Sequence, residues 1–190
     1  MKVERFNISG LALIRPKMHV DDRGFFMESF KDAWFRDNVA DVAFVQDNQS
    51  LSRQSGTLRG LHFQMPPQGQ GKLVRCLRGA IYDVAVDIRP DSATFGQWLG
   101  VHLTPEHNDQ LWIPEGFAHG YCTLVEDTEV FYKVTSPYSK EHEGGLAFDD
   151  PEIAIRWPID VDKAVLSDKD RAQPRLDTLR DKIKLGLIRQ

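Results

Sequence analysis

The first candidate for chemistry in this sequence is a histidine in a strand-like run. His62 stands within Leu58–Gln64, and the cations Arg59 and Lys72 are close to it in the sequence. Histidine titrates near neutral pH, so one imidazole can take up a proton and return it at the working pH. A core histidine that only makes a hydrogen bond is the plain alternative. Simple alternation places Arg59 and His62 on opposite faces of the strand, so either a bulge intervenes or Arg59 acts from a rim.

Three further side chains could move protons or stabilise charge. Tyr132 alternates with Val130 and Val134, which predicts a phenol inside the protein, either as an acid or as an ordinary hydrogen-bonded core tyrosine. Its unperturbed pKa of about 10 means that it needs a cationic neighbour to act as an anion. Lys72 would be unusual as a buried lysine without a partner, and otherwise extends from the end of a loop. Asp170 has the sequence context of a solvated turn carboxylate.

Two stretches resemble the paired metal motifs of the cupin superfamily, whose fold is a jelly roll. The later one, Pro114–His119, matches its Pro-x-Gly-x-x-His element. The earlier one lacks the second histidine, because Gln64 stands two positions after His62. Seven positions before Gly79 the motif calls for an acidic ligand, and this chain has Lys72. An ammonium repels a divalent cation, and two histidines rarely complete a site, so we expect no metal.

The elements that must position these groups are mostly short strands. Alternating or apolar runs are separated by Gly, Pro and Asp turns, which is typical of an antiparallel sandwich or barrel. A doubly wound nucleotide fold is disfavoured, since the chain has no G-x-G-x-x-G. The expected strands are Leu58–Gln64, Leu73–Ile88 with a break at Gly79, Gln110–Pro114, Gly120–Val125 and Thr128–Thr135. Short peripheral helices are expected around Asp32–Asn38 and Asp177–Leu187, and a loop at Met65–Gly71.

The length and composition indicate an ordinary globular protein. The 190 residues suit a single domain over 1–190, with 41% hydrophobic and 27% charged residues. A net charge of −4 and a pI near 5.9 argue against a general nucleic-acid or membrane-surface binder. Two cysteines without a Cys-x-x-Cys spacing predict neither a disulfide framework nor a thiolate zinc site. No signal peptide or membrane span is evident, so we expect a cytoplasmic protein.

Eight motifs together resemble one known family. They match in order, without gaps, from about residue 5 to residue 175, which makes the set far more specific than any single motif. The family is the dTDP-4-dehydrorhamnose 3,5-epimerases of dTDP-L-rhamnose synthesis. The motifs are Asp22–Glu28, Phe44–Asn48, Leu58–Phe63, Lys72–Cys76, Asp83–Arg89, Gly116–Gly120, Tyr132–Thr135 and Leu166–Asp170.

The resemblance implies an all-β, cupin-like jelly roll with a few short peripheral helices, and a reaction without a cofactor. The substrate would be dTDP-4-dehydro-6-deoxy-D-glucose, with a proton removed and returned at C3″ and C5″. His62 would be the general base, oriented and made more basic by Asp170. Tyr132 would be the acid on the other side of the sugar. Lys72 would stabilise the enolate oxygen that forms from the C4″ ketone.

The resemblance also implies the substrate-binding residues. Arg23, Arg59 and His119 would hold the pyrophosphate and the sugar, although Arg23 and Glu28 taken alone could be an exposed ion pair of little consequence. The nucleotide end would be lined by Glu28, Gln46 and Asn48, with Glu143 and Lys169 at further binding positions and Tyr138 at the base or the sugar. A homodimer is implied as well, in which an N-terminal strand pairs with the partner's sheet and helps to complete its site. The apolar character of Arg23–Phe30 is compatible with such burial.

Three alternatives stay open at this point. A relative could invert C3″ alone or act as a ketoisomerase in another dTDP-deoxysugar pathway, and would share most of the chemical residues. A non-catalytic jelly roll that binds a sugar nucleotide would keep its function without His62 or Tyr132. A metal cupin such as a dioxygenase would contain stoichiometric iron or zinc that is lost in His62→Ala.

Overall fold

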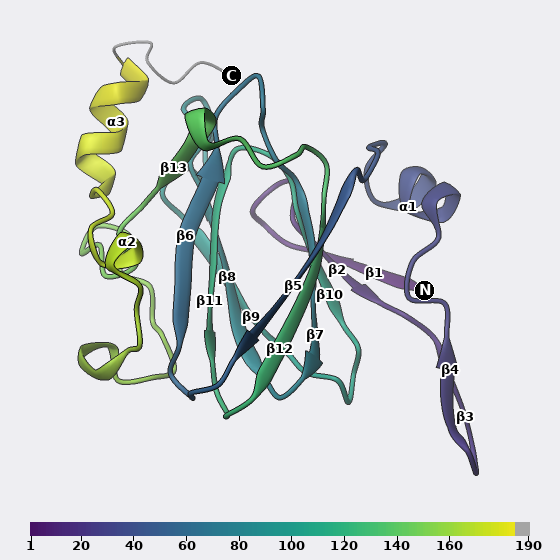
Figure 1. The fold of residues 1–190 in the computed structure, drawn as a ribbon. Coiled ribbons are helices and arrows are strands. Elements are labelled where there is room, and N and C mark those ends of the chain that lie inside the picture. The colour runs from purple at the N-terminus through teal and green to yellow at the C-terminus, as the bar shows by residue number, and fades with distance from the viewer. Residues whose placement is uncertain (185–190) are drawn as a thin grey trace.

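The computed structural model describes residues 1–184 of the chain, with side chains to Arg180. Two antiparallel sheets face one another, and a small hairpin projects away from them (Figure 1). The first sheet has the order β1 (Lys2–Arg5), β2 (Ala12–Arg15), β10 (Gln110–Ile113), β7 (Lys72–Arg78), β12 (Thr128–Val134), β5 (Gln46–Ser52). The second has the order β13 (Glu143–Gly145), β6 (Leu58–Gln64), β11 (Phe117–Thr123), β8 (Ile81–Asp87), β9 (Trp98–Leu103). The hairpin consists of β3 (Met18–Asp21) and β4 (Gly24–Met27).

From β5 onward the chain crosses between the two sheets at nearly every strand, which is the jelly-roll arrangement. This confirms the all-β fold. Of the expected strands, the one placed at Gly120–Val125 was set too late, because β11 begins at Phe117. The run Leu73–Ile88 is broken at Gly79, as predicted, and forms β7 and β8.

Helices are few and lie outside the sandwich (Figure 1). They are α1 (Asp32–Asn38), α2 (Asp168–Arg171) and α3 (Leu176–Lys184), with 3-10 turns η1 (Lys140–His142) and η2 (Val161–Lys163). The first coincides with the expected helix, and the end of the expected tail helix at Leu187 lies outside the described residues. Within the described part of the chain, no helix is both long and apolar enough to cross a membrane.

Side chains from both inner faces form the core between the sheets. Val74, Cys76 and Val130 of the first sheet pack with Ala85 and Phe117 of the second. Tyr132 packs against the same cluster, which confirms that the alternation in β12 turns this phenol inward. This part of the interior is therefore apolar, and the polar groups that share these inner faces need partners of their own.

The second sheet is buried on its outer face as well. Val84 and Val86 of β8 pack there against Trp157, Leu176 and other side chains of the C-terminal segment. This segment carries α2 across the sheet, where it contacts β6. Burial of apolar surface therefore brings the start of the C-terminal region next to the strand that holds His62.

Candidate active site

A cavity of about 370 Å³ opens between the two sheets. Its wall combines strands of both sheets with the loop before β13 and with α2. Nine of the thirteen side chains expected from the sequence line it. These are Arg59, His62, Lys72, His119, Tyr132, Tyr138, Glu143, Lys169 and Asp170.

His62 and Asp170 form a pair at the wall of this cavity. Nε2 of His62 lies 2.6 Å from Oδ1 of Asp170, within ion-pair distance, although neither atom makes a hydrogen bond of standard geometry with the described residues. Ser167 caps α2 by accepting from the Asp170 backbone N–H at 3.1 Å, and its hydroxyl donates to Oδ2 at 2.7 Å. Burial alone would raise the pKa of Asp170, but the bonds from His62 and Ser167 outweigh burial and hold that pKa below its ordinary value. A fixed carboxylate on Nε2 keeps the proton there and leaves Nδ1 as the basic nitrogen.

A β-bulge explains how Arg59 and His62 reach one cavity from positions of opposite parity. In the pairing of β6 with β11, His62 lies opposite His119 and Arg59 lies opposite Tyr121, so β6 has one extra residue. Gly60 within the bulge has φ +120°, and a Cβ there would stand 2.6 Å from the Gly120 Cα. The two strands can approach this closely only without that side chain. The bulge was one of the two outcomes left open by the sequence.

Lys72 and Tyr132 enter the cavity from the opposite sheet, on β7 and β12. Burial lowers the pKa of the Lys72 ammonium to about 8, while the nearby carboxylate of Asp83 acts in the other direction. Burial also raises the pKa of the Tyr132 phenol, and the positive charge of Arg59 partly offsets this. At neutral pH the first group therefore remains a cation and the second a proton donor.

A second histidine–carboxylate pair lies beside the first and was missed in the sequence. Nε2 of His119 is 2.7 Å from Oδ1 of Asp83, and both side chains are buried. The other oxygen of Asp83, Oδ2, has no hydrogen-bond partner among the described residues. The signal that could have revealed it is the parity of β8, since Asp83 and Ala85 share the face opposite to Val84 and Val86. A carboxylate on the inner face of a buried strand requires a partner.

Three of the expected binding residues form a polar cluster at the mouth of the cavity. Tyr138 donates from its hydroxyl to Oε2 of Glu143 at 3.1 Å, and Lys169 forms an ion pair with the same carboxylate. Burial acts to raise the pKa of Glu143, but these two bonds hold it below its ordinary value. Tyr138 as a whole is 58% exposed. It therefore presents an aromatic face to any ligand that enters.

Gln46 and Asn48 lie beside the cavity without lining it. They alternate with Ser50 on one face of β5, and the side-chain N–H of Gln46 donates to Asn48 at 2.7 Å. Asn48 is paired across the ladder with Tyr132, so both project from the same face of the sheet. Ser50 and Tyr121, which share a 2.8 Å hydrogen bond, line the cavity and were not expected from the sequence.

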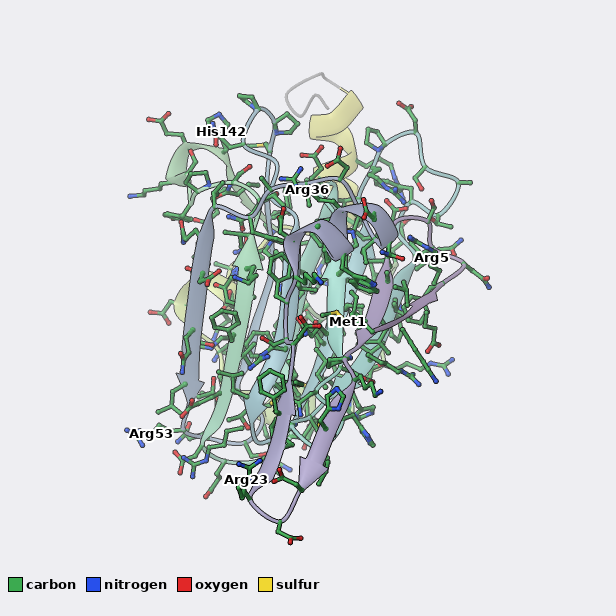
Figure 2. All side chains as sticks on the ribbon, turned by 90° about the vertical axis from the view of Figure 1, so that its right-hand side faces the viewer. Met1, Arg5, Arg23, Arg36, Arg53 and His142 are labelled. Carbon is green, nitrogen blue, oxygen red and sulfur yellow. The ribbon has the colours of Figure 1, made fainter. Side chains whose placement is uncertain are left out.

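Arg23 and Glu28 are not brought to the cavity by their own chain. Arg23 is at the tip of the β3–β4 hairpin with 89% of its side chain exposed, and it pairs with Asp21. Figure 2 places it at the opposite end of the molecule from His142, the residue that precedes Glu143. Glu28 follows β4 and is exposed. Neither side chain therefore lines the cavity of its own chain.

The described residues do not gather the ligands of a metal site. The side chains described, to Arg180, include no group of three or more His, Cys, Asp or Glu arranged to hold a metal ion. At the position of the missing cupin histidine, the side-chain N–H of Gln64 donates to two backbone carbonyls, of Gln68 and Pro137. Lys72 projects into the same cavity as an ammonium. The amide of Gln64 is thus already bonded to the backbone, and the positive charge of Lys72 is the opposite of what a metal ligand needs.

Comparison with known proteins shows the family of this chain. Residues 5–178 match the sequence model of the family described as dTDP-4-dehydrorhamnose 3,5-epimerase. The chain belongs to this family. The dTDP-4-dehydrorhamnose 3,5-epimerase of Sinorhizobium fredii is 56% identical over 176 residues, covering 93% of this chain and 90% of the relative.

Solved structures of the family superpose closely on this chain. The Legionella pneumophila 3,5-epimerase, in complex with dTDP-4-keto-L-rhamnose, has a TM-score of 0.90 at 44% identity and covers 96% of each chain. A 3′-monoepimerase from Streptomyces bikiniensis, in complex with dTDP-quinovose, has a TM-score of 0.87 at 34% identity, covering 96% of this chain and 90% of the other. The epimerase fold thus accommodates both double and single inversion.

Proposed function

We propose that this protein converts dTDP-4-dehydro-6-deoxy-D-glucose to dTDP-4-dehydro-L-rhamnose, a step in the synthesis of dTDP-L-rhamnose. The observation that carries the proposal is the placement of His62 and Tyr132 on facing sheets with one cavity between them. Inverting a carbon requires that a proton leave from one face of the sugar and return to the other. A base on one wall and an acid on the other meet that requirement.

The base in this scheme is His62, supported by Asp170. The ketone at C4″ acidifies the C–H bonds at C3″ and C5″, and in a gluco-configured ring both hydrogens lie on the same face. Nδ1 of His62 takes the proton, and the electron pair of the broken C–H bond moves into an enolate. The Asp170 carboxylate, 2.6 Å from Nε2, stabilises the imidazolium that forms.

The enolate and its reprotonation involve the opposite sheet. Lys72 places an ammonium where negative charge develops on the C4″ oxygen, which lowers the barrier to proton removal. Tyr132 then delivers its phenolic proton to the carbon from the other face, and the ketone is restored. Arg59, whose charge acts on Tyr132, stabilises the phenolate that this leaves.

A homodimer is part of the proposal. Val20, Phe25 and Phe26 of the hairpin expose between 58% and 74% of their surface, which favours burial against a second copy. That copy would receive Arg23 for the pyrophosphate and Glu28 for the nucleotide end. We also propose one domain over 1–190 and a cytoplasmic location, where the free thiols of Cys76 and Cys122 stay reduced.

The dimer can be tested by mixing two inactive chains. If Arg23 acts in the partner's cavity, a mixed dimer of Arg23→Ala and His62→Ala contains one intact site and regains activity at low substrate concentration. If Arg23 acts in its own chain, neither site is intact and the mixture stays as slow as the separate variants.

The reaction itself is tested by incubating the protein with dTDP-4-dehydro-6-deoxy-D-glucose and assigning the product by NMR. Inversion at both carbons is expected. Inversion at C3″ alone would place the chain with single epimerases such as the Streptomyces bikiniensis protein, and an unchanged substrate would refute the proposal.

A further inference from the structure

Gln64 is the residue at which this chain departs from the His-x-His motif, and its side chain has acquired a different set of partners. It is 8% exposed. Its Nε2 donates to the carbonyl of Gln68 at 2.8 Å and to that of Pro137 at 3.1 Å. Its Oε1 accepts from the backbone N–H of Ser139 at 2.7 Å. Both N–H groups of the amide are satisfied by backbone, so the side chain has no donor left for a ligand.

These partners belong to the two loops that border the cavity. One loop follows β6 and runs to Gly71, and the other follows β12 and contains Tyr138. Further bonds join the same loops, from Gln70 to the Ser136 carbonyl at 2.8 Å and from the Ser136 hydroxyl to the Gly69 carbonyl at 2.7 Å. Gln64 differs from these because it is part of β6, the strand that also carries His62. Its amide therefore ties the loops to the wall that holds the base.

The hydrogen bonds of Gln64 to the second loop fall on either side of Tyr138. Pro137 and Ser139 flank this residue, and Gln64 bonds to the backbone of both. The Tyr138 hydroxyl in turn donates to Glu143, which lies opposite Gln64 in the ladder of β6 with β13. The exposed ring of Tyr138 thus has its backbone fixed on both sides by one buried amide and its hydroxyl fixed by the neighbouring strand.

We propose that Gln64 is a positioning residue for nucleotide-sugar binding, which holds Tyr138 at the mouth of the cavity by clamping the loop on both sides of it. The inference rests on the proposed function, since Tyr138 is taken to contact the substrate. It predicts that loss of the clamp weakens binding and leaves the proton-transfer step unaffected, because His62 and Tyr132 keep their own supports.

The first test replaces the amide with a side chain of similar length that cannot bond. In Gln64→Met we expect KM for dTDP-4-dehydro-6-deoxy-D-glucose to rise about tenfold, with kcat changed by less than about twofold. Gln97→Met makes the same exchange at an exposed glutamine before β9 and serves as the control. A fall in kcat with KM unchanged would overturn the proposal.

A double-mutant cycle shows whether the effect passes through Tyr138. If it does, adding Gln64→Met to Tyr138→Ala raises KM by less than about twofold beyond Tyr138→Ala alone. If the increases in KM caused by Gln64→Met and Tyr138→Ala instead multiply in the double variant, the two residues act independently and the proposal is overturned. A wild-type protein without turnover would instead refute the proposed function, and the two failures are thereby distinguished.

A second variant covers the case in which Gln64→Met does not fold. Gln64→Glu keeps the shape and the acceptor for Ser139, but its carboxylate faces two carbonyl oxygens and has no proton to donate. Lowering the pH protonates this carboxylate and restores one donor. The ratio of its KM to that of the wild type is therefore expected to fall as pH decreases from 8 to 6, and a ratio independent of pH would contradict the clamp.

Discussion

Two histidine–aspartate pairs lie next to each other in this cavity, with nearly the same separation and different surroundings. His62 lies 2.6 Å from Asp170 and His119 lies 2.7 Å from Asp83, and the two histidines face each other across the β6–β11 ladder. The His62 side chain is 33% exposed and that of His119 is 8% exposed. The imidazole of His62 is therefore the more open of the two to a substrate carbon. A carboxylate next to the imidazole therefore does not identify the base by itself, and exposure of the imidazole to the cavity separates the two histidines.

The second pair has a different neighbour as well. Asp83 attracts the ammonium of Lys72 and keeps its pKa from falling further than burial would take it. We infer that Asp83 serves the cation that receives the enolate, whereas Asp170 serves the base. The two carboxylates would then support opposite ends of one proton transfer.

The largest expected effect separates the two histidines. His62→Ala should lower kcat by about 10⁴-fold, the upper range for loss of a general base. His119→Ala should act mainly on KM, by about tenfold, because that imidazole contacts the substrate without moving its proton. Steady-state kinetics on both variants measure this difference. Equal losses of kcat would contradict the assignment of a single base.

A smaller effect is expected on the facing sheet. Tyr132→Phe should reduce product formation by about 10²-fold while His62 still exchanges the substrate hydrogens with solvent. Comparing the rate of hydrogen exchange with the rate of inversion measures this. Equal exchange and product formation in the variant would show that Tyr132 is not the acid.

The two aspartates give a direct comparison at the level of the supporting groups. Asp170→Asn removes the charge that stabilises the imidazolium, so kcat should fall by about 10²-fold near neutral pH. Asp83→Asn should lower kcat by only about tenfold near pH 7. The ratio of the two kcat values is the measurement, and a greater loss in Asp83→Asn would mean that Asp83, and not Asp170, supports the base.

The smallest effect is a displacement along the pH axis. Since the pKa of Lys72 is lowered to about 8, kcat/KM should fall as pH rises through about 8 and the ammonium loses its proton. Asp83→Asn removes the attraction that raises this pKa, so the alkaline limb should move to lower pH. An alkaline limb of the kcat/KM profile that does not move in Asp83→Asn would mean that Asp83 has no effect on the pKa of Lys72.

Much of the fold could be predicted from the alternation of apolar and polar residues, because in a short amphipathic strand this alternation indicates which side chains turn inward. The inward position of Tyr132 followed from this, whereas Lys72 was placed at the site only by the cupin motif and the family resemblance. The partnership of Arg59 and His62 did not, since the bulge that unites them depends on the contact of Gly60 with Gly120, far apart in the sequence. The pairing of Asp83 with His119 was missed for a similar reason, because the two lie on different strands, although the parity of β8 alone turns Asp83 inward.

The roles expected of Asp170, Tyr138 and Lys169 came from the resemblance to a family. No local pattern would have joined α2 to β6 across the sheet. Arg23 and Glu28 lie away from the cavity of their own chain, and the role proposed for them in a second copy was suggested by the sequence only through the resemblance and the apolar residues of Arg23–Phe30.

Deuterium incorporation from heavy water tests the central claim most directly. The protein is incubated with dTDP-4-dehydro-6-deoxy-D-glucose in heavy water, and the label is located by mass spectrometry and NMR, with His62→Ala alongside. Label at both C3″ and C5″, lost in His62→Ala and retained in His119→Ala, is the predicted result. Label that persists in His62→Ala would contradict the account, because the proton would then be taken by a group other than the accessible member of the two pairs.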